Sequence, residues 1–239
     1  LIDAETALTA LAVFFIFTLF GWAMPSVTFH NIVGPVSISS FFYPFGIFLF
    51  AFFGLFTIPD LRLALQGHER VIPRVIIFTS VFVAILYLLF ALLVVGVAGA
   101  TTTPVATISL GDVLGPGALW LGSFFALLAL ATSFIALAYS VKHLYIYDYG
   151  FSKFHAFLCA LAAPFLLFVL GFGNFIMLLA ISGALSGGLL MIFVIVMHAR
   201  VKKYATRRPV FSVPHSLILD IFLILLLIVG MIATLQQFL

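Results

Sequence analysis

Charged residues are scarce in this chain of 239 residues: they make up 7% of it, whereas hydrophobic residues make up 65%. So few polar side chains cannot cover the surface of a water-soluble globule, which excludes that class of protein. The chain has a single cysteine, Cys159, so an intrachain disulfide is impossible. The net charge of +3 is not arranged as a basic stripe alternating with aromatic residues, so nucleic acid is not an expected partner. The composition therefore indicates a protein whose main surroundings are a lipid bilayer.

Seven apolar runs follow one another along the chain. Most of them approach the roughly 20 residues that a helix needs to cross about 30 Å of hydrocarbon. The runs cover residues 4–24, 40–59, 75–97, 118–141, 154–172, 175–197 and 217–235. We predict an all-α, polytopic membrane protein with seven transmembrane helices, forming a single transmembrane domain over residues 1–239.

The ten lysine and arginine residues all fall in three of the connections between these runs. They are Arg62, Arg70 and Arg74, then Lys142 and Lys153, then Arg200, Lys202, Lys203, Arg207 and Arg208. The alternate connections, including a long outer loop at 100–117, hold no cation. Basic loops remain in the cytoplasm, so we expect a multi-pass protein of the plasma membrane with a cytoplasmic amino terminus and an external carboxyl terminus. The cations at 200–208 also predict a weak affinity for anionic lipid.

The second run carries four residues that disturb a helix within one membrane thickness: Pro44, Gly46, Gly54 and Pro59. Proline lacks the backbone donor and clashes with the preceding turn, and glycine adds backbone freedom. We predict a discontinuous helix near residues 40–60, with the break around 51–54. A continuous but kinked helix is the alternative, because both residue types are common in membrane helices.

A break at this depth has a functional implication. It frees carbonyl groups at the end of one half-helix and N–H groups at the start of the other. Unpaired groups cost several kcal/mol each in hydrocarbon, so such a break persists only where it is buried in protein or lines a polar cavity. Transporters place substrate and ion sites at breaks of this kind.

The stretch FLFAFFGLFTIP, residues 48–59, resembles the sixth helix of amino-acid permeases of the amino acid–polyamine–organocation superfamily. The similarity is greatest to the hydroxy- and aromatic-amino-acid permease branch, in which an apolar-Phe-Ala-aromatic-x-Gly phrase followed by proline marks a broken helix. It continues through Arg74, LYLLFALLVVG at 86–96, ATISL at 106–110 and ATSF at 131–134. Together these phrases cover effectively the whole chain.

The resemblance implies a fold of two inverted five-helix repeats, of which this chain would hold helices five to eleven. On this interpretation the chain is an amino-terminally truncated transporter with a partial inverted-repeat (5+5) fold. Four helices of the same protein, including the first broken helix, would then be missing partners. We accordingly expect the 239-residue chain alone not to concentrate amino acids in vesicles.

The resemblance also implies a substrate site. The carbonyl groups of residues 50–53 would accept hydrogen bonds from the substrate ammonium, Gly54 would allow close approach, and the rings of Phe52 and Phe53 would act as a gate. The implied substrate-binding residues are Phe50, Ala51, Phe52, Phe53, Gly54, Thr57 and Ser133. The alternative is that the phenylalanine rings only pack against lipid or neighbouring helices, as many of the 30 phenylalanines must.

Thr132 and Ser133 match the hydroxyl pair that helps to bind sodium in sodium-coupled members of this fold. The alternative is that these hydroxyls bond back to a carbonyl of their own helix. Some relatives use a lysine in the fifth helix for proton coupling, but the first run here has no lysine or arginine. This favours Na⁺ over H⁺ as the coupling ion, or coupling residues in the missing part. No organic cofactor and no metal site are expected.

The predicted function is therefore secondary active transport of an amino acid, aromatic or otherwise neutral, by ion-coupled alternating access. A membrane-embedded enzyme is one alternative, but it would need ionisable groups at the centre of a span, where this sequence has none that is convincing. A non-transporting scaffold subunit is the other, but a scaffold does not need exposed carbonyl groups in mid-membrane. We expect no enzymatic activity.

Overall fold

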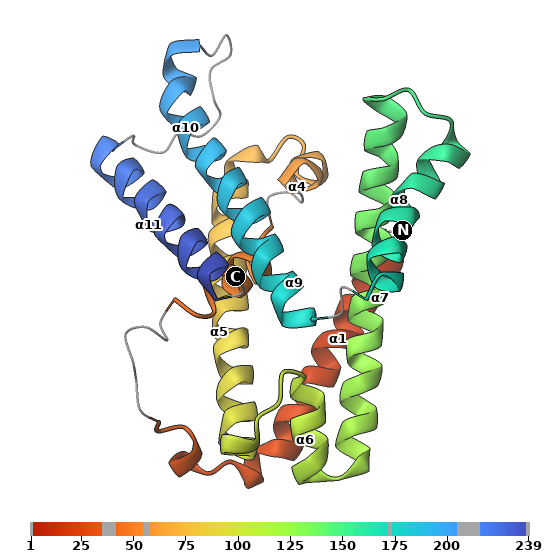
Figure 1. The fold of residues 1–239 in the computed structure, drawn as a ribbon, viewed down its shortest axis with the longest axis vertical. Coiled ribbons are helices and arrows are strands. Elements are labelled where there is room, and N and C mark those ends of the chain that lie inside the picture. The colour runs from red at the N-terminus through yellow and green to blue at the C-terminus, as the bar shows by residue number, and fades with distance from the viewer. Residues whose placement is uncertain (1, 35–41, 55–57, 172–173, 205–215, 238–239) are drawn as a thin grey trace. The chain divides into compact units, whose positions relative to one another are not determined.

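The computed structural model describes residues 2–34, 42–54, 58–171, 174–204 and 216–237 (Figure 1). These residues form helices joined by turns, and the described part of the chain contains no strand. The chain divides into two compact units. Unit 1 comprises Leu1–Gly34 and Leu86–Gly173, and unit 2 comprises Pro35–Ile85 and Asn174–Leu239.

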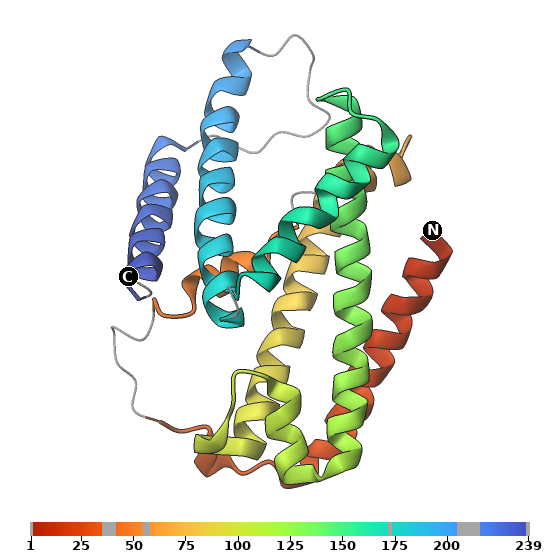
Figure 2. The ribbon, with the colours of Figure 1, turned by 45° about the vertical axis from the view of Figure 1, so that its right-hand side comes forward.

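Unit 1 is built around one long helix, α7, with shorter helices packed along it. Its helices are α1 (Ile2–Ala23), the second half of α5 (Ile72–Ala98), α6 (Ala106–Leu114), α7 (Pro116–Tyr147) and α8 (Lys153–Val169). The helices α1, α6 and α8 each contact α7, and Figure 2 shows α6 folding back beside the first turns of α7. The side chain of Ser152 accepts a hydrogen bond from the His155 N–H and so caps the start of α8.

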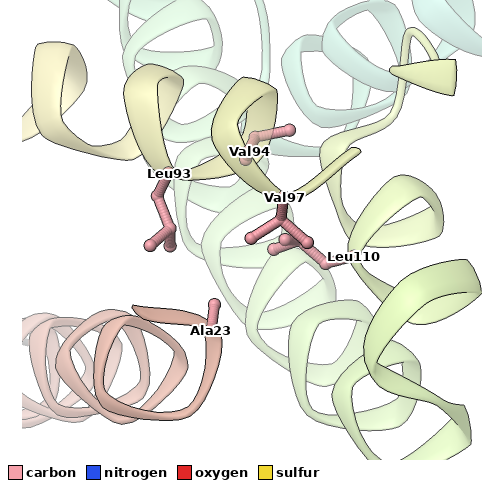
Figure 3. Close-up of a cluster of buried hydrophobic side chains, with 5 residues drawn as sticks. All are labelled: Ala23, Leu93, Val94, Val97 and Leu110. Carbon is pink, nitrogen blue, oxygen red and sulfur yellow. The ribbon is translucent and has the colours of Figure 1, made fainter. Parts of the chain in front are cut away.

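A small apolar core joins three helices of unit 1. Figure 3 shows its five buried members, which are Ala23, Leu93, Val94, Val97 and Leu110. They come from the end of α1, the end of α5 and the middle of α6. This cluster fixes the ends of α1 and α5 against α6.

The connection between α1 and unit 2 also caps α5. The backbone N–H of Thr28 donates to the carbonyl of Gly96 at 2.9 Å, and the Thr28 hydroxyl donates to the same oxygen at 3.2 Å. The Asn31 amide adds a third hydrogen bond to this carbonyl, at 2.9 Å. The last carbonyls of a helix lack partners within the helix, so these donors stabilise the end of α5.

The helix α6 corrects the prediction of a plain loop over residues 100–117. The Ser109 hydroxyl oxygen accepts the Thr103 N–H at 2.7 Å, which fixes the entry of the chain into α6. Ser109, Leu110 and Gly111 are buried, and Gly115, at φ 92°, ends the helix before α7 begins at Pro116. The Thr, Pro and Gly content that suggested a loop instead supplies the two ends of a short helix.

Besides the first half of α5, the described part of unit 2 contains two short helices and two long ones. They are α3 (Phe45–Ala51), α4 (Ile58–Ala64), α9 (Phe175–Ser182) continued by the π-helical turn η6 (Gly183–Gly187) into α10 (Gly188–Tyr204), and α11 (Leu217–Gln236). The side chains of Asn174 and Ser216 cap α9 and α11 by accepting the N–H groups of Met177 and Leu219. The helices α10 and α11 lie side by side in both Figure 1 and Figure 2.

Within the described residues, four helical segments are long and apolar enough to cross a bilayer: α5, α7, the continuous segment from α9 into α10, and α11. Two further apolar stretches, Val13–Ser26 and Lys153–Val169, are shorter. These segments indicate a membrane-embedded, all-α protein. The count of seven spanning helices and the inverted repeat remain predictions.

Candidate functional site

The interruption predicted in the second apolar run lies at the end of α3. This helix has seven residues and ends at Ala51, Phe52 to Gly54 are not helical, and a helix begins again at Ile58. Pro59 occupies the first turn of α4, where its missing N–H group would have no partner within the helix in any case. The proline therefore begins the second helix rather than kinking a continuous one.

Tight backbone turns close the carboxyl end of α3. The Phe52 N–H donates to the Phe48 carbonyl at 3.0 Å, and the Phe53 N–H donates to the Phe50 carbonyl at 3.2 Å. The Gly54 N–H then donates to the Phe52 carbonyl at 2.9 Å. A carbonyl oxygen has two lone pairs, so the Phe50 carbonyl can accept a second donor, such as an ammonium group. This end of the helix also carries the partial negative charge of the helix dipole.

α3 lies backbone to backbone on the segment that contains η6. A Cβ atom added at Gly183 would collide with the Gly46 carbonyl oxygen and lie 2.8 Å from the Phe50 nitrogen. A Cβ added at Gly46 would collide with the Ala180 carbonyl oxygen. Only glycine fits at both positions, and membrane helices use small residues to approach in this way.

The same contact continues to the non-helical residues. At Gly187 an added Cβ would lie 3.5 Å from both the Leu49 Cβ and the Phe53 ring, which places Phe53 over the end of η6. The π-helical turn is a local widening of the helix that is frequent at functional sites. Two departures from α-helical backbone, at 52–54 and at 183–187, therefore meet within unit 2.

The predicted substrate residues on this segment differ in accessibility. Phe50 and Phe52 are 46% and 40% exposed, Ala51 and Gly54 are exposed, and Phe53 is half-buried. Thr57 lies outside the described residues. The stretch SGALSGG at 182–188 has the small residues that are typical of close helix packing. The sequence pattern alone does not indicate that α3 is the partner of this stretch, nor that the stretch forms a π-helical turn.

The predicted ion ligands lie on α7, which belongs to unit 1. The Thr132 hydroxyl donates to the carbonyl oxygens of Leu128 and Ala129, at 3.1 and 2.9 Å, and Ser133 is exposed. This is the back-bonded arrangement considered as the alternative to ion binding. It uses the hydroxyl proton, and the lone pairs of the Thr132 oxygen still allow it to bind a cation. The ion site thus stays a prediction.

The site residues belong to two compact units, with 50–54 in unit 2 and Thr132 and Ser133 in unit 1. Among the described residues, no group of three or more His, Cys, Asp or Glu side chains is placed to hold a metal ion.

Comparisons of the chain with models of known families, with curated proteins and with solved structures found no match. The resemblance to amino-acid permeases therefore rests on the sequence phrases alone.

Proposed function

We propose that the protein is a secondary transporter of a small zwitterionic solute, with a neutral and preferably aromatic amino acid as the substrate. The observation that carries the proposal is the interruption at Phe52–Gly54 between the short apolar helix α3 and the short helix α4, which follows it and carries Asp60 and Arg62. Non-helical backbone at membrane depth is tolerated where it is buried in protein or lines a polar cavity, and in transporters it binds substrate. A scaffold has no requirement for it.

The backbone at the interruption can accept a hydrogen bond from the ammonium end of such a solute. The end of α3 is partly negative, and the Phe50 carbonyl has a lone pair for an ammonium donor. Exposed Phe50 and Phe52 rings beside it suit an apolar or aromatic side chain. The carboxylate of the substrate needs donors elsewhere, which the permease resemblance assigns to the first broken helix. On this proposal the reaction is movement across the membrane, with no covalent step and no organic cofactor.

Binding of radiolabelled amino acids to the full-length protein tests the proposal. We expect saturable binding of an aromatic or small neutral amino acid and none of a charged one. Gly54→Val should abolish binding, because the added side chain obstructs the backbone that receives the ammonium. Gly21→Val on α1 is the control, since a Cβ there meets no atom within 4 Å. Failure of every neutral amino acid to bind the unmodified protein would contradict the proposal.

Ion coupling needs a second measurement. If Na⁺ is coupled through Thr132 and Ser133, substrate binding should require Na⁺, and Thr132→Val should raise the half-saturating Na⁺ concentration about ten-fold, as expected for one lost oxygen ligand to a charge. Ser123→Ala removes an exposed hydroxyl from the same helix and should leave this concentration unchanged. Binding that is independent of Na⁺ but varies with pH would instead favour proton coupling.

A further inference from the structure

The two tryptophans of unit 1 and four of its five tyrosines gather near the two ends of α7. The chain has two tryptophans, and both lie near the start of this helix. Trp120 is 76% exposed on the first turns of α7. Trp22 packs against Gly117, where an added Cβ would lie 2.6 Å from the Trp22 Cη2. Tryptophan is enriched at the boundary between hydrocarbon and headgroups.

At the other end of α7, tyrosine and histidine rings form a row. Tyr139, His143 and Tyr147 follow at intervals of four residues, with ring centroids 4.2 and 5.4 Å apart. A second group continues past the helix end, where the Tyr145 ring lies 5.8 Å from Tyr149 and stacks on Phe151 at 5.6 Å. Most of these rings are well exposed, as the values of 52%, 76% and 66% for Tyr139, Tyr147 and Tyr149 show.

The distance along α7 between the tryptophan near its start and the first tyrosine near its end matches the thickness of the hydrocarbon layer. From Trp120 to Tyr139 the helix rises about 29 Å, at 1.5 Å per residue. The hydrocarbon layer is about 30 Å thick. The interval 121–138 holds no charged residue, whereas Lys142 follows the first tyrosine of the row within one turn. α7 has 32 residues and is therefore longer than the hydrocarbon layer by several turns.

The segment beyond Tyr139 carries the charges that suit lipid phosphates. Residues 139–155, which we name the aromatic turn, contain Lys142, Lys153 and two histidines against a single acid, Asp148. Lysine stems can lie along apolar surface while the ammonium group reaches the headgroups. Amphipathic rings and cations on the same short segment are the composition of an interfacial anchor.

We propose that the aromatic turn docks into the phospholipid headgroup layer, with Tyr139 and Trp120 at the two boundaries of the hydrocarbon. Lys142 and Lys153 contact lipid phosphates, and the tyrosine rings occupy the interface. The docking sets the depth of α7 in the membrane. It is independent of whether the protein transports an amino acid.

Tryptophan fluorescence measures this depth directly. In the full-length protein carrying Trp22→Phe and Trp120→Phe, a single tryptophan is placed by Leu130→Trp, Tyr139→Trp or Tyr147→Trp, and the protein is reconstituted in phosphatidylcholine vesicles. Lipids brominated near the chain ends should quench L130W most, and lipids brominated near the headgroup should quench Y139W most. Y147W, about 12 Å further along the helix than Tyr139, should respond both to the headgroup-brominated lipids and to an aqueous quencher. Deep quenching of Y139W equal to that of L130W would overturn the proposal, as would absence of lipid quenching at L130W.

The lysines have a matched control. We expect Lys142→Gln with Lys153→Gln to reduce phospholipid retained by the purified protein, measured by native mass spectrometry, by about five-fold for each cation lost from the headgroup layer. Arg62→Gln with Arg70→Gln removes the same charge from exposed positions elsewhere and should have a smaller effect. Equal losses in the two pairs would overturn the role of the lysines. Displacement of the lipid by inorganic phosphate would show that they bind free phosphate instead.

Discussion

Glycine residues decide how closely the helices of unit 2 approach. At Gly46 and Gly183 the partner is backbone, a carbonyl oxygen in each case, so no side-chain rotation can make room for a methyl group. Gly188 differs, because its neighbour is the flexible Met231 side chain, with the sulfur 2.7 Å from the added Cβ. Only the first two positions therefore fix the distance between α3 and its neighbour. Close approach of this kind also permits Cα–H···O contacts between backbones.

Gly183→Ala should destabilise the protein by forcing α3 away from η6. Overpacking of a close contact typically costs about 1–3 kcal/mol, and here the obstructing atoms are backbone. Thermal unfolding of the detergent-purified protein should show a lower midpoint. Gly21→Ala, where an added Cβ meets no atom within 4 Å, should leave the midpoint nearly unchanged. Equal midpoints for the two variants would mean that α3 and η6 are not in backbone contact.

The helix boundaries that could be predicted from the sequence are the ones that nearby residues determine. Gly54 and Pro59 indicated an interruption near 51–54, and α3 ends at Ala51, with Gly54 among the non-helical residues and Pro59 in the first turn of α4. The π-helical turn was not predicted, since its hydrophobic pattern is that of the surrounding helix. Its partner, α3, lies more than a hundred residues earlier in the chain. The contact between α3 and η6 depends on tertiary packing, which a local sequence pattern does not predict.

The helix α6 escaped prediction for a different reason. Its nine residues include Gly111, and its flanks are rich in Thr and Pro, so composition favoured a loop. What stabilises it is the contact with α7, where Gly111 lies against Leu119, together with the hydroxyl of Ser109. Short helices are marginal in isolation and depend on such packing.

Ser109→Ala tests how far this hydroxyl stabilises α6. Ser109 is 1% exposed, and its oxygen lies 2.7 Å from the Thr103 nitrogen and 2.8 Å from the Thr103 hydroxyl. Loss of the acceptor from a buried donor typically costs about 1–3 kcal/mol, and because Thr103 is half-buried we expect a cost near the lower end of this range. We expect a lower unfolding midpoint and faster hydrogen exchange over 103–114, whereas Ser123→Ala on exposed α7 surface should change neither. Unchanged exchange would show that packing on α7 is sufficient.

For the molecule as a whole, the positions of the cations in the sequence predict which helix ends face the cytoplasm. Arg74 lies in the first turn of α5, Lys142 near the end of α7, Lys153 at the start of α8 and Arg200 near the end of α10. From the positive-inside rule we predict that all of these ends face the cytoplasm. The segment between α5 and α7, which holds no cation, should then lie outside.

Cysteine accessibility tests this orientation. Cys159 is the only cysteine, so Cys159→Ser gives a cysteine-free background. In that background Thr102→Cys, between α5 and α6, and Tyr149→Cys, between α7 and α8, introduce thiols at exposed positions. A membrane-impermeant maleimide should label the first in intact cells, and the second only after permeabilisation, because α7 separates the two positions by one crossing. The reverse pattern would invert the topology. Labelling of both thiols in intact cells would mean that α7 does not cross the bilayer, and the match between its aromatic spacing and the hydrocarbon thickness would then have no physical basis.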